Sequence, residues 1–446
     1  MSSTELNKLK IAFHTLGCKV NIYESEVMQE LVREAGASVV PFDGMADVYI
    51  VNTCTVTNTA DKKSRSYLRR PRKINPEAIV AACGCYAQVE GEKLLAEGIA
   101  DILIGADEKQ DLVGILSAYI GKGIHRPVKD LSKPSPFSAM ALHTLSSHTR
   151  ADIKVQDGCN QFCSYCIIPY ARGRIRSREI GDAVSEIREL SLRGVQEFVL
   201  TGIHLSSYGR DFPDPAGDEL LKLTEAVHEI PGVKRIRFGS LEPRIVTEEF
   251  AKRLSALPKI CPHFHLSLQS GSRDTLRRMN RHYTPEEYLE SCGILRSFFD
   301  DPALTTDVIA GFPGETEREF SETCEFIRRA AFSELHVFKY SRRKGTAADR
   351  MPDQVPEEIK NERSGILIGL GEELSEAYRK RFIGREVSVL TEQKGMLFGQ
   401  EVYFGYTKEY LRTAVSSKNL RENVIVSGKA EECAAPGILY LPAGTD

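Results

Sequence analysis

Three closely spaced cysteines are the residues of this sequence best suited to chemistry. Cys159, Cys163 and Cys166 lie in KVQDGCNQFCSYCIIPYARGR with the spacing C-x3-C-x2-C. Thiolates at this spacing can converge on a soft metal centre. A structural zinc site uses four protein ligands, and no histidine lies within 155–170 to act as the fourth. A four-iron cluster held by three cysteines keeps one iron open, so the triplet indicates catalysis. A zinc loop completed by a distant Cys or His is the alternative.

A second set of three cysteines lies near the start of the chain, and each of them follows an apolar run predicted to be a strand. Cys18 follows the run 10–16, Cys54 follows the run 47–53, and Cys85 follows the run 78–83. Helical patterns separate the runs, which predicts a parallel sheet whose site lies beyond the carboxyl ends of its strands. We therefore expect the three cysteines at one edge of the sheet. The alternative is that they are ordinary buried small side chains.

Positive charge gathers beside both cysteine sets. The first stretch, 61–73, contains Lys62, Lys63, Arg65, Arg69, Arg70, Arg72 and Lys73. The second stretch contains Arg172, Arg174, Arg176 and Arg178. Both are predicted to contact phosphates, because neutralising phosphates is the main electrostatic term in nucleic-acid binding. For the first stretch, a solvated helix face is an equal alternative.

Composition describes an ordinary globular protein. The chain has 446 residues, 41% of them hydrophobic, and a net charge of −3, so any nucleic-acid footprint must be local. No apolar run approaches the ~20 residues of a membrane span, and the first residues lack the apolar core of a signal peptide. Eleven cysteines without an export signal favour thiolates in a reducing compartment, so we expect a cytoplasmic location.

Alternating strand and helix patterns predict an α/β protein in three parts. Residues 8–130 should form a doubly wound α/β domain, followed by a linker over 121–150. Six strand–helix units follow, and their strands are predicted at 152–158, 197–203, 235–240, 264–270, 303–312 and 335–341. Six such units make a partial barrel with its site at the carboxyl ends of the strands. After a helical connector over 356–381, short strands predict a small β-barrel at 381–446.

The cysteine strings resemble a known family. DGCNQFCSYCIIPYARGR resembles the cluster loop of the radical S-adenosylmethionine (SAM) methylthiotransferases, and TLGCKVN, VNTCTVTNTADKKSR and GCYAQ resemble their amino-terminal domain. The resemblance implies two [4Fe–4S] clusters, with SAM chelated at the open iron of the one held by Cys159, Cys163 and Cys166. It implies that Cys18, Cys54 and Cys85 hold the auxiliary cluster and that Cys83 is only a strand residue. It also identifies 145–375 as a radical SAM barrel.

The same resemblance implies cofactor contacts at the ends of the barrel strands. The strings are LTGIHLSSYG, SLEP, LQSG and TDVIAGFPGE, together with the aromatic residue before the last cysteine. The implied SAM-binding residues are Tyr165, Thr201, Gly202, Ser240, Glu242, Gln269 and Asp307. Without the resemblance, each polar residue among them could equally cap a turn at a strand end.

The last part of the chain resembles an RNA-binding module. VSVLTE and GYTKEYLR resemble the TRAM domain of tRNA methylthiotransferases. Four aromatic side chains there could stack on unpaired bases, namely Tyr403, Phe404, Tyr406 and Tyr410. They could equally be core aromatics of a small barrel.

The string around Cys54 implies a substrate. It resembles the branch that converts N6-threonylcarbamoyladenosine, at tRNA position 37, to its 2-methylthio form. One SAM would methylate a sulfur on the auxiliary cluster, and a second, cleaved at the other cluster, would supply the 5′-deoxyadenosyl radical that activates C2. The implied partners are a tRNA anticodon stem-loop, an external electron donor and a sulfur source, with no membrane.

Three alternatives to this substrate and activity stay open. Related branches of the family act on isopentenyladenosine in tRNA or on a ribosomal-protein aspartate. The third alternative, of a different class, is a non-catalytic iron–sulfur RNA-binding redox sensor.

Overall fold

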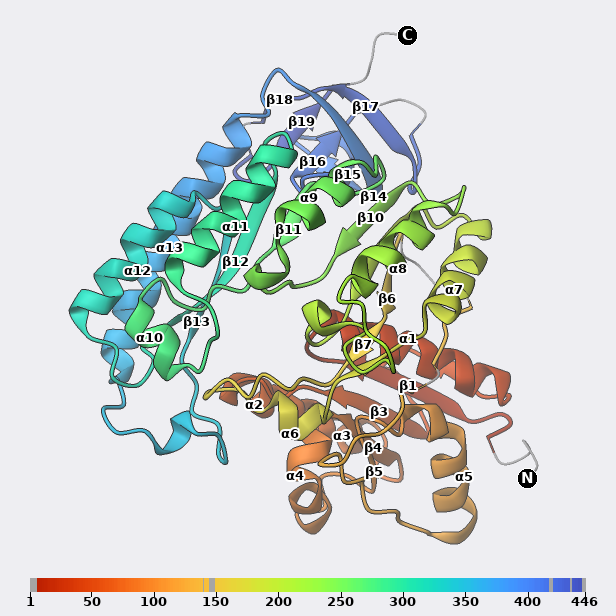
Figure 1. Ribbon diagram of the computed structural model, residues 1–446. Helices are drawn as coiled ribbons and strands as arrows, with labels where there is room; N and C mark the ends of the chain where they lie inside the picture. Colours follow the sequence, from red (N-terminus) through yellow and green to blue (C-terminus); the bar gives the residue numbers. More distant parts are fainter. Residues whose placement is uncertain (1–5, 139, 144–148, 417–419, 434, 443–446) are drawn as a thin grey trace.

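The computed structural model describes residues 6–138, 140–143, 149–416, 420–433 and 435–442 (Figure 1). The predicted boundary at 145 and the last residues of the predicted range 381–446 lie outside the described residues. No helix in these described ranges is long and apolar enough to cross a membrane.

The amino-terminal domain is a five-stranded parallel sheet with helices on both faces. Its strands run in the order β2-β1-β3-β4-β5. They are β1 Lys10–Thr15, β2 Ser38–Val40, β3 Val48–Thr53, β4 Ile79–Gly84 and β5 Ile102–Ile104. The helices are α1 Lys19–Glu34, α2 Asn58–Arg69, α3 Pro71–Ile74, α4 Cys85–Ala96, the short η1 Lys109–Asp111 and α5 Leu112–Lys122. Alternate side chains of the buried strands face opposite layers: Ile50 packs with α1 and α5, and Val51 packs with α2 and α4. The doubly wound prediction is confirmed.

The central part contains the six predicted parallel strands. They are β6 Arg150–Lys154, β9 Glu197–Thr201, β10 Arg235–Phe238, β11 His263–His265, β12 Ala303–Ala310 and β13 Glu334–Lys339. They form two three-stranded sheets, β10-β9-β6 and β11-β12-β13, which isolated bridges such as Leu241 to Leu266 connect. The helices between them are α7 Ile180–Leu192, α8 Glu219–His228, α9 Glu248–Ser255, α10 Arg273–Arg278, α11 Pro285–Phe298 and α12 Glu317–Ala330. The shorter turns are η2 Leu205–Ser207, η3 Pro243–Ile245 and η4 Ala348–Arg350.

The carboxy-terminal part is a curled sheet of six strands rather than a closed barrel. Helix α13 Glu357–Lys380 leads into it along the outside of β13 (Figure 1). The strands are β14 Glu386–Leu397, β15 Gln400–Thr407, β16 Arg412–Val415, β17 Ile425–Lys429, β18 Glu431–Glu432 and β19 Leu439–Leu441. Their order is β17-β14-β15-β16-β19-β18, and the two end strands do not pair among the residues described.

The two outer parts contact opposite ends of the barrel strands (Figure 1). Arg235 and Arg237, at the start of β10, donate hydrogen bonds to backbone carbonyls of the carboxy-terminal sheet. The amino-terminal domain instead meets the loops that leave the carboxyl ends of the strands, where α4 packs against α6 Ile168–Arg172. Because barrel sites lie at the carboxyl ends, the amino-terminal domain is the part that faces the site.

The predicted linker over 121–150 is not a loose connection where it is described. Met140 and Leu142 are buried in the main core. The Tyr23 hydroxyl donates to the Met140 carbonyl at 2.8 Å, and the Leu142 amide donates to Glu186 at 2.8 Å. This segment therefore joins the first helix of the chain to the first helix of the barrel.

Candidate active site

The three cysteines of the amino-terminal domain lie at one edge of its sheet. Cys18 is the N-cap residue of α1, Cys85 is the first residue of α4, and Cys54 directly follows β3. The strand order reverses between β1 and β3, and sheets of this order bind ligands at such a switch point. The positive ends of α1 and α4 favour anionic groups such as thiolates.

Two glycines make this convergence possible. Gly17 and Gly84 have φ angles of +101° and +86°, which a residue with a Cβ adopts only under strain. A Cβ on Gly17 would lie 3.1 Å from the Cys54 sulfur, so the loop before Cys18 approaches Cys54 closely. A Cβ on Gly84 would lie 2.8 Å from the Thr53 carbonyl oxygen, so the turn before Cys85 also comes close to the residue that precedes Cys54.

Polar side chains fix the cysteine loops to the sheet. The Asn21 amide donates to the Leu16 and Thr53 carbonyls, which ties the loop after β1 to the end of β3. The Thr53 hydroxyl donates to the Cys83 carbonyl at 2.6 Å and accepts from the first amides of α4. Burial raises the pKa of Cys54 to about 11, so its sulfur needs a metal ion to become a thiolate at neutral pH.

The C-x3-C-x2-C loop is closed at its base by a two-stranded ladder that the sequence did not predict. The short strands β7 Gln156–Asp157 and β8 Arg176–Ser177 pair antiparallel and bracket the loop and α6. The segment between α10 and α11 holds the loop from outside: the Met279 carbonyl accepts from the Ser164 amide at 3.0 Å. Arg281 Nη1 donates to the Cys163 sulfur at 3.2 Å.

One cavity contains residues of both cysteine sets. It has a volume of about 390 Å³ and lies between the loop after β1, the cluster loop and the ends of β12 and β13. Its lining includes Cys18 from the first set and Cys166 from the second, with Tyr165, Gln269 and Asp307. The sequence did not predict the contributions of Phe338, Tyr340 and Ser341. The cavity therefore joins the two proposed metal sites.

The remaining predicted SAM contacts lie at the carboxyl ends of β9 and β10, outside the lining of this cavity. Thr201 is buried at the end of β9, next to Gly202, and Ser240 is exposed. Glu242 is buried, and its carboxylate lies 3.5 Å from His204 Nε2. Burial alone would raise the pKa of Glu242, but His204, Arg281 and Arg244 hold it at about 2. Glu242 is therefore an anion at neutral pH, beside the cluster loop.

The loop after β13 ties the barrel to the Cys54 loop. The Arg343 guanidinium donates to Thr55 at 2.6 Å and to Asp61 at 2.7 Å. The Ser341 hydroxyl accepts from the Asn58 amide at 2.9 Å. Arg343 therefore anchors this loop of the barrel to the amino-terminal domain.

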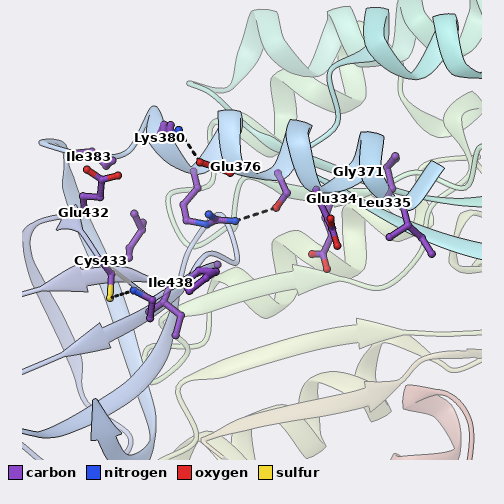
Figure 2. A pocket seen from close by; sticks show the side chains of 17 residues that line it. Glu334, Leu335, Gly371, Glu376, Lys380, Ile383, Glu432, Cys433 and Ile438 are labelled. Atoms are coloured by element: carbon purple, nitrogen blue, oxygen red, sulfur yellow. Dashed lines mark hydrogen bonds and ion pairs between the residues drawn. The ribbon is translucent and has the colours of Figure 1, made fainter. Parts of the chain in front are cut away.

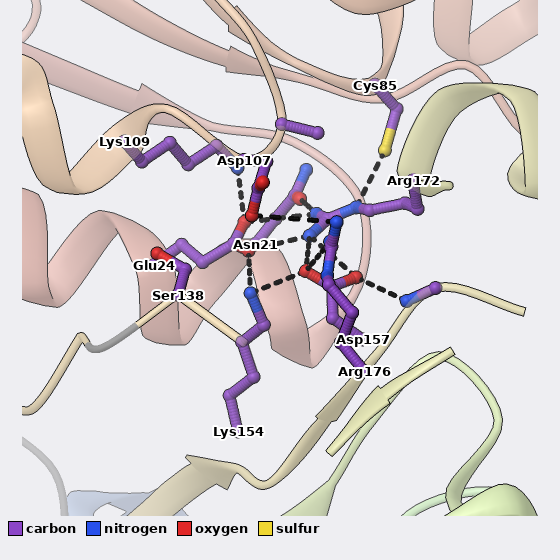
Figure 3. Close-up of polar contacts among 12 residues, drawn as sticks. Asn21, Glu24, Cys85, Asp107, Lys109, Ser138, Lys154, Asp157, Arg172 and Arg176 are labelled. Carbon is purple, nitrogen blue, oxygen red and sulfur yellow. Dashed lines mark hydrogen bonds and ion pairs between the residues drawn. The ribbon is translucent and has the colours of Figure 1, made fainter. Parts of the chain in front are cut away.

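A buried network of charges joins the amino-terminal domain to the barrel beside Cys85 (Figure 3). Arg172 is fully buried and donates to both oxygens of Glu24, at 2.6 and 3.0 Å. Its Nε donates to the Cys85 sulfur at 3.2 Å. Burial alone would raise the pKa of Glu24, but Arg172, Lys109 and Lys154 hold it well below its usual range.

This network corrects the prediction that 172–178 contacts phosphates. Arg172, Arg176 and Arg178 are buried, and each is paired with a carboxylate of the protein. Of the four arginines, Arg174 alone is partly exposed. The partners that neutralise them, such as Glu24, lie up to 148 residues away, and for that reason the local sequence gave no sign of the pairing.

The basic stretch 61–73 is also less positive than its sequence suggests. Its three later arginines all have acidic partners: Arg69 pairs with Glu97, Arg70 with Asp43 and Arg72 with Asp101. Lys62, Lys63 and Lys73 are exposed. The structure therefore favours the solvated-face alternative for these three arginines, whereas the exposed lysines keep the potential for phosphate contact.

Two of the four aromatic residues predicted to stack on bases instead pack against other residues of the protein. Tyr406 and Tyr410 stack on each other with ring centroids 4.6 Å apart. The Arg150 guanidinium covers both rings, at 5.3 and 5.0 Å from their centroids. Arg150 begins β6, so this pair packs against the end of the barrel that is remote from the cluster loop.

A larger groove lies away from the cysteines. It has a volume of about 840 Å³ and lies between α13 and the carboxy-terminal sheet (Figure 2). Its charged lining contains four carboxylates and two cations, namely Glu334, Glu372, Glu376, Glu432, Arg379 and Lys380. An acidic groove repels phosphates, so its size does not make it a nucleic-acid site.

Both cysteine sets fit iron–sulfur ligation. Each set offers three thiols, the ligand type that Fe–S clusters use. In the part of the chain that is described, no three His, Cys, Asp or Glu side chains converge as the ligands of a single ion would. The cysteines of a cluster bind different irons and need not converge on one point. The arrangement therefore does not support the single-zinc alternative for the triplet.

A partial barrel that carries a C-x3-C-x2-C loop at the carboxyl ends of its strands defines the radical SAM class. Residues 153–327 match the radical SAM superfamily, and residues 10–105 match the uncharacterized protein family UPF0004. A solved structure of the same fold is the radical SAM methyltransferase TsrM of Kitasatospora setae with cobalamin and a [4Fe-4S] cluster bound. It is 15% identical, with a TM-score of 0.57 over 76% of this chain and 77% of that one.

Curated relatives match nearly the whole chain. The threonylcarbamoyladenosine tRNA methylthiotransferase MtaB of Bacillus subtilis is 41% identical, over 90% of this chain and 89% of the relative. MtaB of Thermotoga maritima is 37% identical, over 94% of this chain and 97% of the relative. The tRNA-2-methylthio-N(6)-dimethylallyladenosine synthase of Caldicellulosiruptor saccharolyticus is 36% identical, over 94% of this chain and 86% of the relative. The chain belongs to the radical SAM methylthiotransferase family.

Proposed function

We propose that this protein methylthiolates C2 of N6-threonylcarbamoyladenosine at position 37 of tRNA. The MtaB relatives of Bacillus subtilis and Thermotoga maritima support this substrate. The observation that carries the proposal is the 390 Å³ cavity, because its lining combines Cys18 and Cys166, one from each cysteine set. An enzyme that replaces a C–H bond with a C–S bond needs its source of radicals and its source of sulfur close to the same substrate carbon.

Two [4Fe–4S] clusters and SAM are the cofactors of this proposal. Cys159, Cys163 and Cys166 would hold one cluster, and Cys18, Cys54 and Cys85 the other. When bound, the first cluster and SAM supply radical chemistry at an unactivated C–H bond, and the second supplies sulfur. The chain's own residues position these groups, and Glu242 supplies a fixed negative charge suited to hydroxyl donors such as those of a ribose.

An RNA partner is supported by an aromatic and cationic surface on the cluster loop. Tyr170 is 54% exposed, and its ring meets Phe162 edge to face at 6.0 Å. The Arg174 guanidinium lies 4.7 Å from the Phe162 ring centroid. Asn280 donates to the Phe162 carbonyl and holds that residue at a φ of +48°. Such a platform suits the unpaired bases of an anticodon stem-loop.

The proposal also includes a cytoplasmic location, an external electron donor and an external sulfur source. Eleven cysteines and the proposed tRNA substrate support the location. A methylthio product requires a sulfur atom for each turnover, and radical formation requires an electron. Neither comes from the substrate.

The second candidate substrate is isopentenyladenosine in tRNA. The relative from Caldicellulosiruptor saccharolyticus, named as a synthase of the dimethylallyl derivative, favours it at 36% identity. The identity to MtaB of Bacillus subtilis is higher, at 41% over a similar share of the chain. We therefore rank threonylcarbamoyladenosine first.

An anaerobic turnover assay with the reconstituted protein tests the substrate. We expect SAM-dependent 2-methylthio product on a tRNA that carries threonylcarbamoyladenosine, and none on a matched tRNA that carries isopentenyladenosine. The reverse preference would support the second candidate. Cleavage of SAM separates an enzyme from a redox sensor, because a sensor has no need of it.

A further inference from the structure

Each cysteine set has one arginine that donates a hydrogen bond to a sulfur atom. Arg172 Nε lies 3.2 Å from the Cys85 sulfur, and Arg281 Nη1 lies 3.2 Å from the Cys163 sulfur. The two arginines come from different elements: Arg172 ends α6, and Arg281 lies between α10 and α11. Neither contact is local in sequence, since the partners are 87 and 118 residues apart.

Arg172 belongs to a buried network that is rich in positive charge (Figure 3). Lys109 pairs with Glu24, and Lys154 bridges Glu24 and Asp157 at 2.7 and 2.6 Å. Arg176 lies 3.1 Å from Asp157 and 3.6 Å from Asp107. All the ionisable members are at most 4% exposed, namely Glu24, Asp107, Lys109, Lys154, Asp157, Arg172 and Arg176.

The charges of the seven buried residues in this network do not sum to zero. Four cations face three carboxylates, so one positive charge is left in a buried site. An uncompensated buried charge is costly. Apart from these carboxylates, Arg172 donates to the neutral side chain of Asn21 and, through Nε, to the Cys85 sulfur. A ligating thiolate at Cys85 supplies the missing negative charge.

Arg281 is fixed in a comparable way at the other site. Its Nε donates to the Tyr283 hydroxyl at 3.1 Å, and its guanidinium lies 4.8 Å from the Tyr283 ring centroid. Tyr283 is itself buried and donates to the Leu268 carbonyl at 2.6 Å. These contacts leave one edge of the guanidinium directed at Cys163.

We propose that Arg172 and Arg281 are positioning residues for the two iron–sulfur clusters, each raising the reduction potential of its own cluster through a hydrogen bond to a ligating sulfur. The inference rests on the proposed function, which requires both clusters. Hydrogen bonds to the sulfurs are one of the factors that set cluster potentials. A donor stabilises the more negative, reduced form, so its loss makes reduction harder. Both bonds act only on the cluster beside them.

The test measures each cluster separately by anaerobic potentiometric titration with electron paramagnetic resonance. Replacing Cys159, Cys163 and Cys166 with Ala leaves the Cys85 cluster alone, and replacing Cys18, Cys54 and Cys85 leaves the other. Arg172→Gln should shift the potential of the Cys85 cluster to more negative values and leave the Cys163 cluster unchanged. Arg281→Gln should do the reverse. Each arginine variant is thus the matched control of the other.

Arg172→Lys covers the case in which Arg172→Gln does not fold, because it keeps the buried positive charge. It should fold and shift the potential in the same direction by a smaller amount. Unchanged potentials in both Arg172→Lys and Arg281→Gln, with about four irons retained, would overturn the inference. So would equal shifts of both clusters by either variant. Absence of iron from both cysteine sets in the parent protein would instead overturn the proposed function.

Discussion

Cys83 and Cys85 are two positions apart and occupy different environments. Cys83 lies in β4, is fully buried and packs in the main core with residues such as Ile104. Cys85 begins α4, and its sulfur accepts a hydrogen bond from Arg172. The glycine between them reverses the chain at the strand end, so that one thiol faces the core and the other the site edge.

Substituting these two cysteines separates ligation from packing. Cys85→Ala should remove the auxiliary cluster and abolish methylthiolation, because a thiolate is the ligand. Cys83→Ala should keep both and cost about 1 kcal/mol of unfolding free energy for a small buried side chain. Iron content, product formation and urea unfolding of the two variants measure this. An inactive Cys83→Ala beside an active Cys85→Ala would reverse the ligand assignment.

At the residue scale, the sequence predicted those features that depend on the spacing of nearby residues. The positions of the six cysteines relative to strands followed from apolar runs and local spacing. Arg172 and Arg281 were beyond this reasoning, because their sulfur partners lie 87 and 118 residues away. The pattern ARGRIRSR is the same whether its arginines face solvent or buried carboxylates, and the phosphate prediction for 172–178 was therefore wrong for three of them.

The loop after β13 is the element that closes the site against the amino-terminal domain. Arg343 is buried and donates to Thr55 and Asp61, whereas its neighbour Arg342 is 55% exposed and pairs with Asp349 at the surface. The two arginines are adjacent and chemically identical, so they form a natural pair for a test.

We expect Arg343→Gln to destabilise the protein much more than Arg342→Gln. Breaking a buried ion pair costs about 3 kcal/mol or more, and an exposed pair contributes about 0.5 kcal/mol. Thermal unfolding of the two variants measures the difference. Arg343→Gln should also lower methylthio product relative to SAM cleavage, because the Cys54 loop loses its anchor on the barrel. Equal behaviour of the two variants would show that the loop does not fix the domains.

Long strands were predictable, whereas four of the very short strands were not predicted as separate elements. The apolar strands β1, β3 and β4 lie within about a residue of the predicted runs, because buried parallel strands have continuous apolar patterns. The strands β2 and β5 have three residues each, and β7 and β8 have two, which is too short for a periodic signal.

In the whole molecule, the barrel lies between two modules that cover opposite ends of its strands. The amino-terminal domain faces the cluster loop, and the carboxy-terminal sheet covers the starts of the barrel strands. There, Glu197 lies among Arg150, Arg235 and Arg237, all largely buried. The sequence predicted both modules. It did not predict which barrel end each covers, because that depends on side-chain pairs more than 150 residues apart.

The contacts between the carboxy-terminal sheet and the barrel determine what removal of residues 381–446 should do. The deletion should expose Glu197 and its arginines and lower the unfolding temperature by on the order of 10 °C, so that weaker tRNA binding would be ambiguous. Phe398→Ala is the cleaner change, because Phe398 is 71% exposed at the β14–β15 turn. It should leave unfolding unchanged and weaken tRNA binding about fivefold or more, because one base–aromatic stacking contact contributes ~1 kcal/mol or more. Leu192, which lies on α7 and is 84% exposed, is the control.

Salt dependence tests whether the lysines that remain exposed meet phosphates. Charge-neutralising Lys62, Lys63 and Lys73 should reduce the slope of tRNA affinity against salt by about one unit per lost contact. Neutralising Arg69, Arg70 and Arg72 should leave the slope nearly unchanged, because these arginines already have acidic partners. A larger effect from the arginines would mean that they exchange those partners for phosphates.

Nucleoside mass spectrometry of tRNA tests the central claim most directly. A strain that lacks this gene should accumulate N6-threonylcarbamoyladenosine without its 2-methylthio derivative. The wild-type gene should restore the derivative, whereas genes carrying Cys85→Ala or Cys166→Ala should not, because the claim requires both cysteine sets at one substrate. An unchanged 2-methylthio-threonylcarbamoyladenosine level in the deletion strain, or its restoration by either cysteine variant, would contradict the account.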